Sequence, residues 1–261
     1  MSPDATVPPH IVLVTGASRG VGRAVARAFA ATGARVALGG RDVAALESVA
    51  DECSDLGSQR TVVLPFDVTD ERACRDAVGT ATEELGPIST LVNNAGVAES
   101  SPFLRTTLDQ WRRTMSVDVE APFILTQSVL PGMLAVGAGT VVNIASVAAK
   151  LGLPYVAAYT AAKHALLGMT RSAAAEFASS GITFNCICPF YVDTEMTRAT
   201  IANIVEKTGR TEAQAMENLV NPQGRLIDPT HIAELCVFLA SSSARSITGQ
   251  AYNIDGGLVQ S

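Results

Sequence analysis

The sequence predicts a single-domain α/β fold in which a doubly wound parallel sheet of about seven strands is covered by helices on both faces. Seven short apolar runs with little alternation are typical of strands buried on both sides of a parallel sheet. Helical patterns separate them, which indicates successive βαβ units with right-handed crossovers. The 261 residues, 48% of them hydrophobic, suffice for one such domain and exclude a disordered chain.

The elements follow one another regularly along the chain. The predicted strands span residues 11–14, 35–38, 61–66, 90–92, 140–144, 182–187 and 251–254. Helices are predicted from Gly20 to Thr32 with Gly33 after the end, from an Asp70 cap to Leu85, from a Thr107–Gln110 capping box through Trp111, over 157–177, and from Asp228-Pro229 to near Ala240. Residues 193–227 depart from this alternation, and a stretch of that length is more often a functional lid than a plain connection.

Composition narrows the class of protein. The net charge is −6, with 19 basic and 25 acidic residues, which excludes a general binder of phosphate backbones. The five scattered cysteines form no CxxC pair and predict free thiols rather than a metal site. Residues 1–9 lack the features of a secretion signal and are expected to be a loose leader before a domain over 10–261. With no run of about 18 consecutive apolar residues, we expect a cytoplasmic protein without a membrane span.

A glycine-rich turn directly follows the first predicted strand. Residues 15–22 read Thr-Gly-Ala-Ser-Arg-Gly-Val-Gly and lead into a helix. Gly16 permits the tight turn, Gly20 allows close approach of a pyrophosphate, and Gly22 allows the helix to pack near the sheet. The helix N-terminus then offers unpaired N–H groups to phosphates. Taken alone, the glycines could simply let the chain reverse.

The end of the second predicted strand bears on the choice of dinucleotide. A carboxylate is usual there for binding the ribose 2′-hydroxyl of NAD(H), but this chain has Gly40 followed by Arg41. A guanidinium can pair with a 2′-phosphate, and Arg19 supplies a second cation nearby. These residues favour NADP(H). The alternative is that Arg41 is an ordinary surface residue and Asp42 plays the acidic role, which would make NAD(H) possible.

Three residues suggest acid–base chemistry. Tyr159 and Lys163, four positions apart in a helical run, share one helix face. We expect the lysine ammonium to lower the pKa of the phenol from its ordinary ~10. Ser146 follows a predicted strand at the edge where open α/β sheets bind ligands, so its hydroxyl could bond a carbonyl oxygen. Each residue separately has an ordinary alternative: core packing, a solvated charge or a helix cap.

From about Ile11 to Gly257 the chain resembles the short-chain dehydrogenase/reductase family. The matching motifs, in order, are the glycine turn, Asp67-Val68, Asn93-Asn94-Ala95-Gly96, Ser146, Tyr159-x-x-x-Lys163 and Asp255-Gly256-Gly257. The resemblance implies a Rossmann-type domain, NADP(H) or NAD(H) as cofactor, and a homotetramer or homodimer. It implies that Tyr159 is the general acid/base, Ser146 orients the carbonyl, and Lys163 holds the ribose and tunes Tyr159.

The resemblance also implies a set of cofactor-binding residues. They are Gly16, Ser18, Arg19, Gly20, Val21, Gly22, Arg41, Asp67, Val68, Asn94, Ala95, Gly96, Tyr159, Lys163, Pro189, Val192 and Thr194.

Two positions depart from the family pattern. An asparagine usually lies seven residues after a tryptophan and positions a water in a proton relay; here Trp111 is followed at that distance by Asp118. We include Asp118 among the catalytic residues as the substitute; a changed pH optimum or lost turnover are the alternatives. Phe190 replaces a usual glycine after Pro189 and could narrow the substrate pocket or pack under the lid.

The expected reaction is hydride transfer between a nicotinamide and a ketone or secondary alcohol, with a 3-oxoacyl or other apolar carbonyl as a candidate substrate. We consider three alternatives: an NAD-dependent secondary-alcohol or 3-hydroxyacyl dehydrogenase, a weakly active or non-catalytic dinucleotide sensor, which Asp118 would favour, and a dehydratase or epimerase on the same fold. The expected partner is a small molecule, not nucleic acid or a membrane.

Overall fold

The computed structural model describes residues 10–260, so the predicted leader over residues 1–9 lies outside the described residues. One sheet contains β1 (Ile11–Thr15), β2 (Arg35–Gly40), β3 (Thr61–Pro65), β4 (Thr90–Asn93), β5 (Gly139–Ile144), β6 (Ile182–Pro189) and β7 (Ala251–Ile254). Their order is β3-β2-β1-β4-β5-β6-β7, and all six pairings are parallel. Strands β2 and β3 are added on one side of β1, and β4 to β7 are added on the other. The order of strands therefore switches between β1 and β4, and the carboxyl ends of these two strands form the expected binding crevice.

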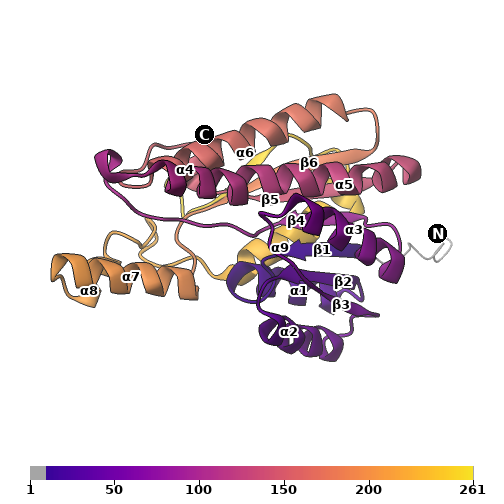
Figure 1. The fold of residues 1–261 in the computed structure, drawn as a ribbon, viewed down its shortest axis with the longest axis horizontal. Coiled ribbons are helices and arrows are strands. Elements are labelled where there is room, and N and C mark those ends of the chain that lie inside the picture. Colours follow the sequence, from indigo (N-terminus) through magenta and orange to yellow (C-terminus); the bar gives the residue numbers. More distant parts are fainter. Residues whose placement is uncertain (1–9, 261) are drawn as a thin grey trace.

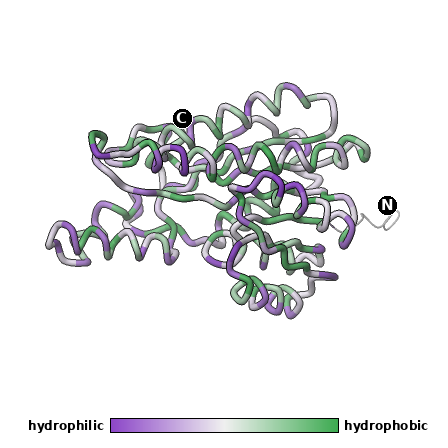
Figure 2. Tube along the Cα trace, in the orientation of Figure 1, coloured by the Kyte–Doolittle hydropathy of each residue, from purple (hydrophilic) through white to green (hydrophobic). Residues whose placement is uncertain are grey.

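Helices cover both faces of this sheet, as predicted (Figure 1). One face carries α1 (Gly20–Ala31), α2 (Val43–Asp55) and α9 (Pro229–Ala240), packed on a core that includes Val12, Phe29 and Ile232. The other carries α3 (Glu71–Leu85), α4 (Leu108–Met115), α5 (Ala121–Val136) and α6 (Ala157–Glu176), with Leu13 and Phe184 in its core. Hydrophobic residues recur along the central strands (Figure 2), as a sheet buried on both faces requires.

The predicted helix signals are confirmed by side-chain contacts. Asp70 accepts a hydrogen bond from the amide of Ala73 at 3.0 Å, and Asp228 accepts one from Thr230 at 2.8 Å. The Thr107–Gln110 capping box forms in both directions. Helix α2 was not predicted; it begins where Asp42 caps the amide of Ala45 at 3.2 Å. Side-chain acceptors therefore fix where these helices start.

The segment 193–227 is mostly helical, although no helix was predicted there. It forms α7 (Glu195–Thr208) and α8 (Glu212–Met216), which project from one end of the sheet (Figure 1). The two helices share a small hydrophobic cluster of Ile201, Ala215 and Leu219. A separate cluster lets the segment hold its own shape while its two ends join the main domain.

Helices α4 and α5 are joined by η2 (Ser116–Glu120), a π-helical turn, into the run Leu108–Val136. Among residues 10–260 this is the one helix long and apolar enough to cross a membrane by length and composition. In the fold it packs against α3 and α6 as part of a helical layer. Buried residues such as Leu125 and Val129 and exposed ones such as Phe123 and Leu134 both contribute to its hydropathy.

Candidate active site

The glycine turn lies at the carboxyl end of β1 and its geometry requires glycine. Gly16 and Gly20 have φ angles of +64° and +54°, in the left-handed region that favours glycine. A β-carbon on Gly22 would lie 2.2 Å from the carbonyl oxygen of Gly16, which would force the backbone apart. Ser18 and Val21 are half-buried within the turn. The glycines therefore bring α1 close to the end of the strand.

Helix α1 begins without a side-chain cap. Arg19 occupies the N-cap position with no capping hydrogen bond, and the first turn contains no acidic residue. Helices α2, α3 and α7, in contrast, are capped by Asp42, Asp70 and Thr194. The exposed amides and positive end of α1 therefore lie at the reversal point of the sheet, which fits the pyrophosphate of a dinucleotide.

A hydrogen-bond cluster joins this turn to the end of β4. The Asn94 side-chain amide donates to the carbonyl oxygens of Thr15 at 2.9 Å and Gly16 at 3.2 Å. The Thr15 hydroxyl accepts from the amides of Asn94 and Ala95, both at 3.0 Å. Thr15 was not predicted as a site residue, although its place directly before the glycines is a usable signal. Asn94 and Ala95 thus hold the glycine turn against the end of β4.

The residues predicted to choose the dinucleotide lie at the exposed rim. Arg41 is 3.5 Å from a carboxylate oxygen of Asp67, and Arg19 is 3.6 Å from Glu195 of α7. Asp42 caps α2, where its Oδ1 accepts from the amide of Ala45 at 3.2 Å.

Asp67 and Val68 follow β3 at the same rim. The Asp67 carboxylate accepts from both the amide and the hydroxyl of Thr69, and these bonds lower the pKa of Asp67 more than the nearby Arg41 does. Val68 is half-buried and packs against the core beneath α3.

Ser146, Tyr159 and Lys163 converge beside β5. Ser146 follows the strand, is 8% exposed, and accepts from the amide of Ala148 at 3.1 Å, so it also caps a short turn. The Lys163 amine is 5.4 Å from the centre of the Tyr159 ring and donates to the carbonyl of Ile144 at 3.1 Å. Tyr155, in contrast, is 64% exposed and lies outside this group.

Asp118 completes the cluster. It is fully buried in the π-helical turn η2, and its Oδ2 lies 3.3 Å from the Lys163 amine. Its Oδ1 accepts from the amide of Val97 at 2.8 Å. Gly96 faces the pair closely, since a β-carbon there would lie 3.4 Å from Asp118 and 3.6 Å from Lys163. A buried ion pair thus lies directly behind Tyr159.

Lys163 shifts the pKa of Tyr159 in the predicted direction, but the net pKa in this structure is raised. Burial raises the pKa of the phenol above its ordinary 10.0, and this is the largest effect. The Lys163 ammonium lowers it as predicted, but the Asp118 carboxylate raises it again. Interaction with Ser146 lowers it only in part. The four-residue spacing of Tyr159 and Lys163 predicts the effect of the lysine on the phenol. It does not predict the burial of Tyr159 or the approach of Asp118 from another helix.

The chain after β6 connects the crevice to the projecting helices. Pro189 ends the strand, and Phe190 packs edge-on against Tyr191, with ring centres 4.9 Å apart. Val192 is buried and forms a β-bridge with Ile227, which joins the two ends of the 193–227 segment. Thr194 caps α7, and its methyl lies 3.2 Å from where a β-carbon of Gly20 would be. The segment therefore begins directly against the glycine turn.

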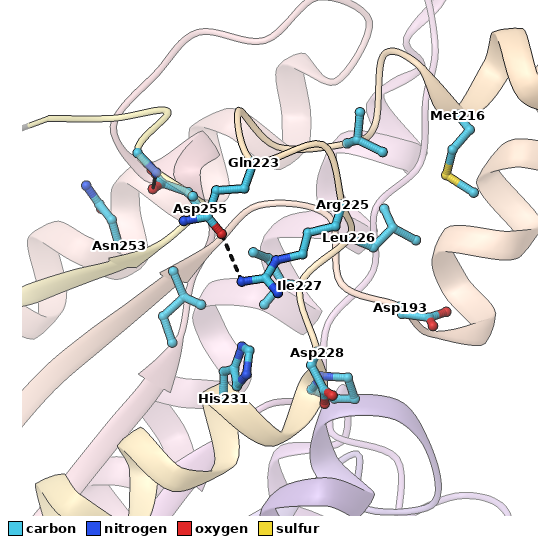
Figure 3. A pocket seen from close by; sticks show the side chains of 15 residues that line it. Asp193, Met216, Gln223, Arg225, Leu226, Ile227, Asp228, His231, Asn253 and Asp255 are labelled. Carbon is cyan, nitrogen blue, oxygen red and sulfur yellow. Dashed lines mark hydrogen bonds between the residues drawn. The ribbon is translucent and has the colours of Figure 1, made fainter.

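A large hollow on the surface is a different feature. About 1100 Å³ in volume, it lies between the 216–229 stretch, the start of α9 and the 253–257 turn (Figure 3). Arg225 projects into it and donates to Gln223 at 3.0 Å, and His231 lies at its edge. Ser146, Tyr159 and Lys163 do not line it. The chemistry of the residues, not the size of the hollow, locates the candidate site.

A doubly wound sheet with an uncapped glycine turn and a tyrosine–lysine pair defines a class of dinucleotide-dependent oxidoreductases. The family model described as enoyl-(acyl carrier protein) reductase matches residues 16–259. The chain belongs to the short-chain dehydrogenase/reductase family, and it is an oxidoreductase of that family acting on carbonyl or alcohol substrates.

Relatives and solved structures agree with this assignment. The chain is 38% identical to the acetoacetyl-CoA reductase of Shinella zoogloeoides over 95% of its own length and 98% of the relative's. It is 36% identical to a 3-oxoacyl-(acyl-carrier-protein) reductase of Vibrio cholerae, covering 95% and 96%. An actinorhodin polyketide ketoreductase solved with NADPH superposes with a TM-score of 0.92 at 31% identity, covering 98% of this chain and 99% of that one.

Proposed function

We propose that the protein is an NADP(H)-dependent oxidoreductase that interconverts a ketone and a secondary alcohol. The observation that carries this proposal is the convergence of Ser146, Tyr159 and Lys163 beside the crevice that the glycine turn opens. The bound dinucleotide supplies or accepts the hydride. The chain's own residues then have to orient the carbonyl and move one proton.

Each of these residues has a distinct role in the proposed reaction. The Tyr159 hydroxyl donates its proton to the carbonyl oxygen as charge develops there, and in the reverse direction the phenolate takes a proton from the alcohol. The Ser146 hydroxyl donates a hydrogen bond to the same oxygen and stabilises its developing charge. Lys163, anchored by the Ile144 carbonyl, places a positive charge near the phenol. Helices α7 and α8 act as a lid that excludes water when substrate is bound.

The preference for NADP(H) is supported by the second strand. Gly40 and Arg41 stand where a carboxylate would repel a 2′-phosphate, and the side chain of Arg41 is 69% exposed. Asp42 is turned to the start of α2. The actinorhodin ketoreductase and an L-sorbose reductase of Gluconobacter frateurii, at a TM-score of 0.91 and 28% identity, were both solved with NADPH.

An apolar substrate is supported by exposed apolar side chains in the 103–104 stretch and in the first turn of α7. Phe103 and Leu104 are strongly exposed, in a stretch near Tyr155, whose carbonyl accepts from the amide of Ser101 at 2.7 Å. Met196, in the first turn of α7, is also exposed. We infer a 3-oxoacyl or other apolar ketone, and two relatives that reduce 3-oxoacyl thioesters by name favour the first.

We also propose a homotetramer or homodimer, working in the cytoplasm on a small molecule. Trp111, Phe123, Leu134 and Val136 expose apolar surface on the Leu108–Val136 run, and a second copy of the chain would bury it. Light scattering of the purified protein measures this directly. A Phe123→Asp variant should dissociate or weaken the assembly, and a wild-type monomer would contradict the proposal.

A screen of ketones, 3-oxo esters and secondary alcohols with NADPH and NADH tests the function. Turnover is followed by the absorbance of the reduced nicotinamide. We expect reduction of at least one apolar ketone, with NADPH preferred. Faster turnover with NADH would favour the NAD-dependent dehydrogenase. Dinucleotide binding without turnover on any substrate would favour the non-catalytic sensor.

A further inference from the structure

A carboxylate lies within the acid–base cluster, where a neutral side chain would satisfy the same backbone contact. Asp118 is fully buried, and the Lys163 side chain is only 5% exposed. The Lys163 amine lies between two oxygens, Asp118 Oδ2 at 3.3 Å and the Ile144 carbonyl at 3.1 Å. Burying a charged side chain costs free energy unless an opposite charge lies next to it. The Asp118 carboxylate and the Lys163 ammonium supply that opposite charge to each other.

The pair changes the charge that Tyr159 experiences. A lysine ammonium alone would stabilise a phenolate. Here the negative charge of Asp118, 3.3 Å from the Lys163 amine, offsets most of the positive charge that the phenol experiences. The formation of a phenolate would then leave the buried cluster with a net negative charge. Burial raises the pKa of the Asp118 carboxyl, and the adjacent Lys163 ammonium and the Val97 amide lower it. The ion pair therefore favours the carboxylate at the alkaline pH where phenols titrate, and the cancellation operates there.

We propose that Asp118 is a positioning residue that fixes Lys163 in a buried ion pair and thereby keeps the Tyr159 hydroxyl protonated. The protonated phenol is the form that delivers a proton to a carbonyl oxygen, so the cluster is set for carbonyl reduction over a wide pH range. The reverse reaction needs the phenolate and is confined to more alkaline pH. This functional consequence rests on the proposed role of Tyr159, whereas the ion pair and its effect on the phenol do not.

The other groups around Tyr159 do not replace this effect. Burial raises the pKa of the Cys188 thiol and raises that of Cys186 to about 12, so both stay neutral through physiological pH. Burial likewise raises the pKa of Tyr191. Helix α4 also packs against α6 and carries charged residues, but all three of them are exposed: Asp109, Arg112 and Arg113. Asp118 and Lys163 are therefore the two charged side chains that shift the pKa of the Tyr159 phenol.

A pH titration of the cofactor-free protein tests the proposal. The ultraviolet absorbance of phenolate is measured in wild type and in Tyr159→Phe, and their difference isolates Tyr159. The same subtraction is made in an Asp118→Asn background, which keeps an oxygen for the Val97 amide and removes only the charge. Asp76→Asn, an exposed position on α3 with a side chain 71% exposed, is the matched control.

We expect Tyr159 in wild type to titrate above the ordinary 10.0 of tyrosine. Asp118→Asn should lower that midpoint by about one pH unit or more. Asp76→Asn should leave it unchanged. In alcohol oxidation, Asp118→Asn should shift the pH profile to lower pH by the same amount, which a merely structural role would not produce.

Two results would overturn the proposal. One is an equal midpoint in wild type and Asp118→Asn. The other is a titration midpoint of Tyr159 in the wild type below the ordinary 10.0 of tyrosine. This result would overturn the proposal even if Asp118→Asn fails to fold. Turnover reports separately on the proposed function: wild-type protein without turnover, but with the expected titration, would remove the reaction and leave the ion pair intact.

Discussion

The amine of Lys163 lies 5.4 Å from the centre of the Tyr159 ring, one turn further along α6. The helix fixes this relationship, because residues four apart lie on one face. The sheet places the pair near Ser146: the Lys163 amine reaches the carbonyl of Ile144 at the end of β5, two residues before Ser146. Local sequence and parallel topology together therefore bring Ser146, Tyr159 and Lys163 to one place.

Gly22 is predicted to be indispensable to the glycine turn. In Gly22→Ala the new methyl would meet the Gly16 carbonyl at 2.2 Å, a contact that only a backbone shift relieves. We expect a loss of at least about 2 kcal/mol in the free energy of unfolding and much weaker dinucleotide binding. Chemical denaturation and NADPH fluorescence measure the two effects.

Gly79→Ala is the matched control for this substitution. Gly79 lies in α3 and a β-carbon there meets nothing within 4 Å. The substitution should stabilise the protein by about 0.5–1 kcal/mol, because alanine favours helix. If Gly22→Ala lowers the free energy of unfolding no more than Gly79→Ala does, α1 does not approach the end of β1 as closely as the structure shows.

Arg41 is predicted to select the dinucleotide. Arg41→Ala removes a charged hydrogen-bond donor at the rim of the crevice, so NADPH affinity should fall roughly ten- to a hundred-fold while NADH affinity changes little. Titration calorimetry with both dinucleotides measures the ratio. Arg60→Ala, before the start of β3 and therefore at the opposite ends of these parallel strands, where Arg60 pairs with Glu84, should affect neither. Equal losses for NADPH and NADH would rule out pairing with the 2′-phosphate.

The attachment of α1 to α2 is predicted to depend on pH. Glu52 accepts hydrogen bonds from Arg23 at 3.0 and 2.7 Å and pairs with Arg27, and the Arg23 bond lowers the pKa of Glu52 below its ordinary 4.5. A lowered pKa means that this stabilisation is present above pH 4.5 and is lost as pH falls through the folded-state value.

Glu52→Gln should accordingly lower the free energy of unfolding by about 0.5–1 kcal/mol at neutral pH. The difference from wild type should vanish in acid, as urea denaturation at several pH values would show. Glu47→Gln, an exposed position on the same helix, should have little effect at any pH. A Glu52 effect that persists unchanged in acid would contradict the ion-pair explanation.

The sheet could be predicted because its strands are short, apolar and bounded by turn residues. All seven were located, and the end of β3 moved by only one residue, from Phe66 to Pro65. The helices with polar caps, such as Asp70 and Asp228, were found for the same local reason. Helix α2 was not predicted, although Asp42 caps it.

What escaped prediction depends on contacts between distant segments. The spacing of Tyr159 and Lys163 predicts that the lysine lowers the pKa of the phenol. It does not predict that Asp118, from a different helix, pairs with Lys163. The effect of burial on the phenol likewise requires the assembled fold. The helices within 193–227 are stabilised by contacts such as that of Ile201 with the cluster around Ala215, which no local periodicity predicted.

The proposed role of Tyr159 as general acid/base is tested by removing its hydroxyl group. Reductive turnover of the best ketone is compared between wild type and Tyr159→Phe, with dinucleotide affinity measured on the same samples. We predict a loss of turnover on the order of 10²–10⁴-fold with nearly unchanged affinity. Retention of most of the turnover by Tyr159→Phe would show that the phenol is not the general acid/base.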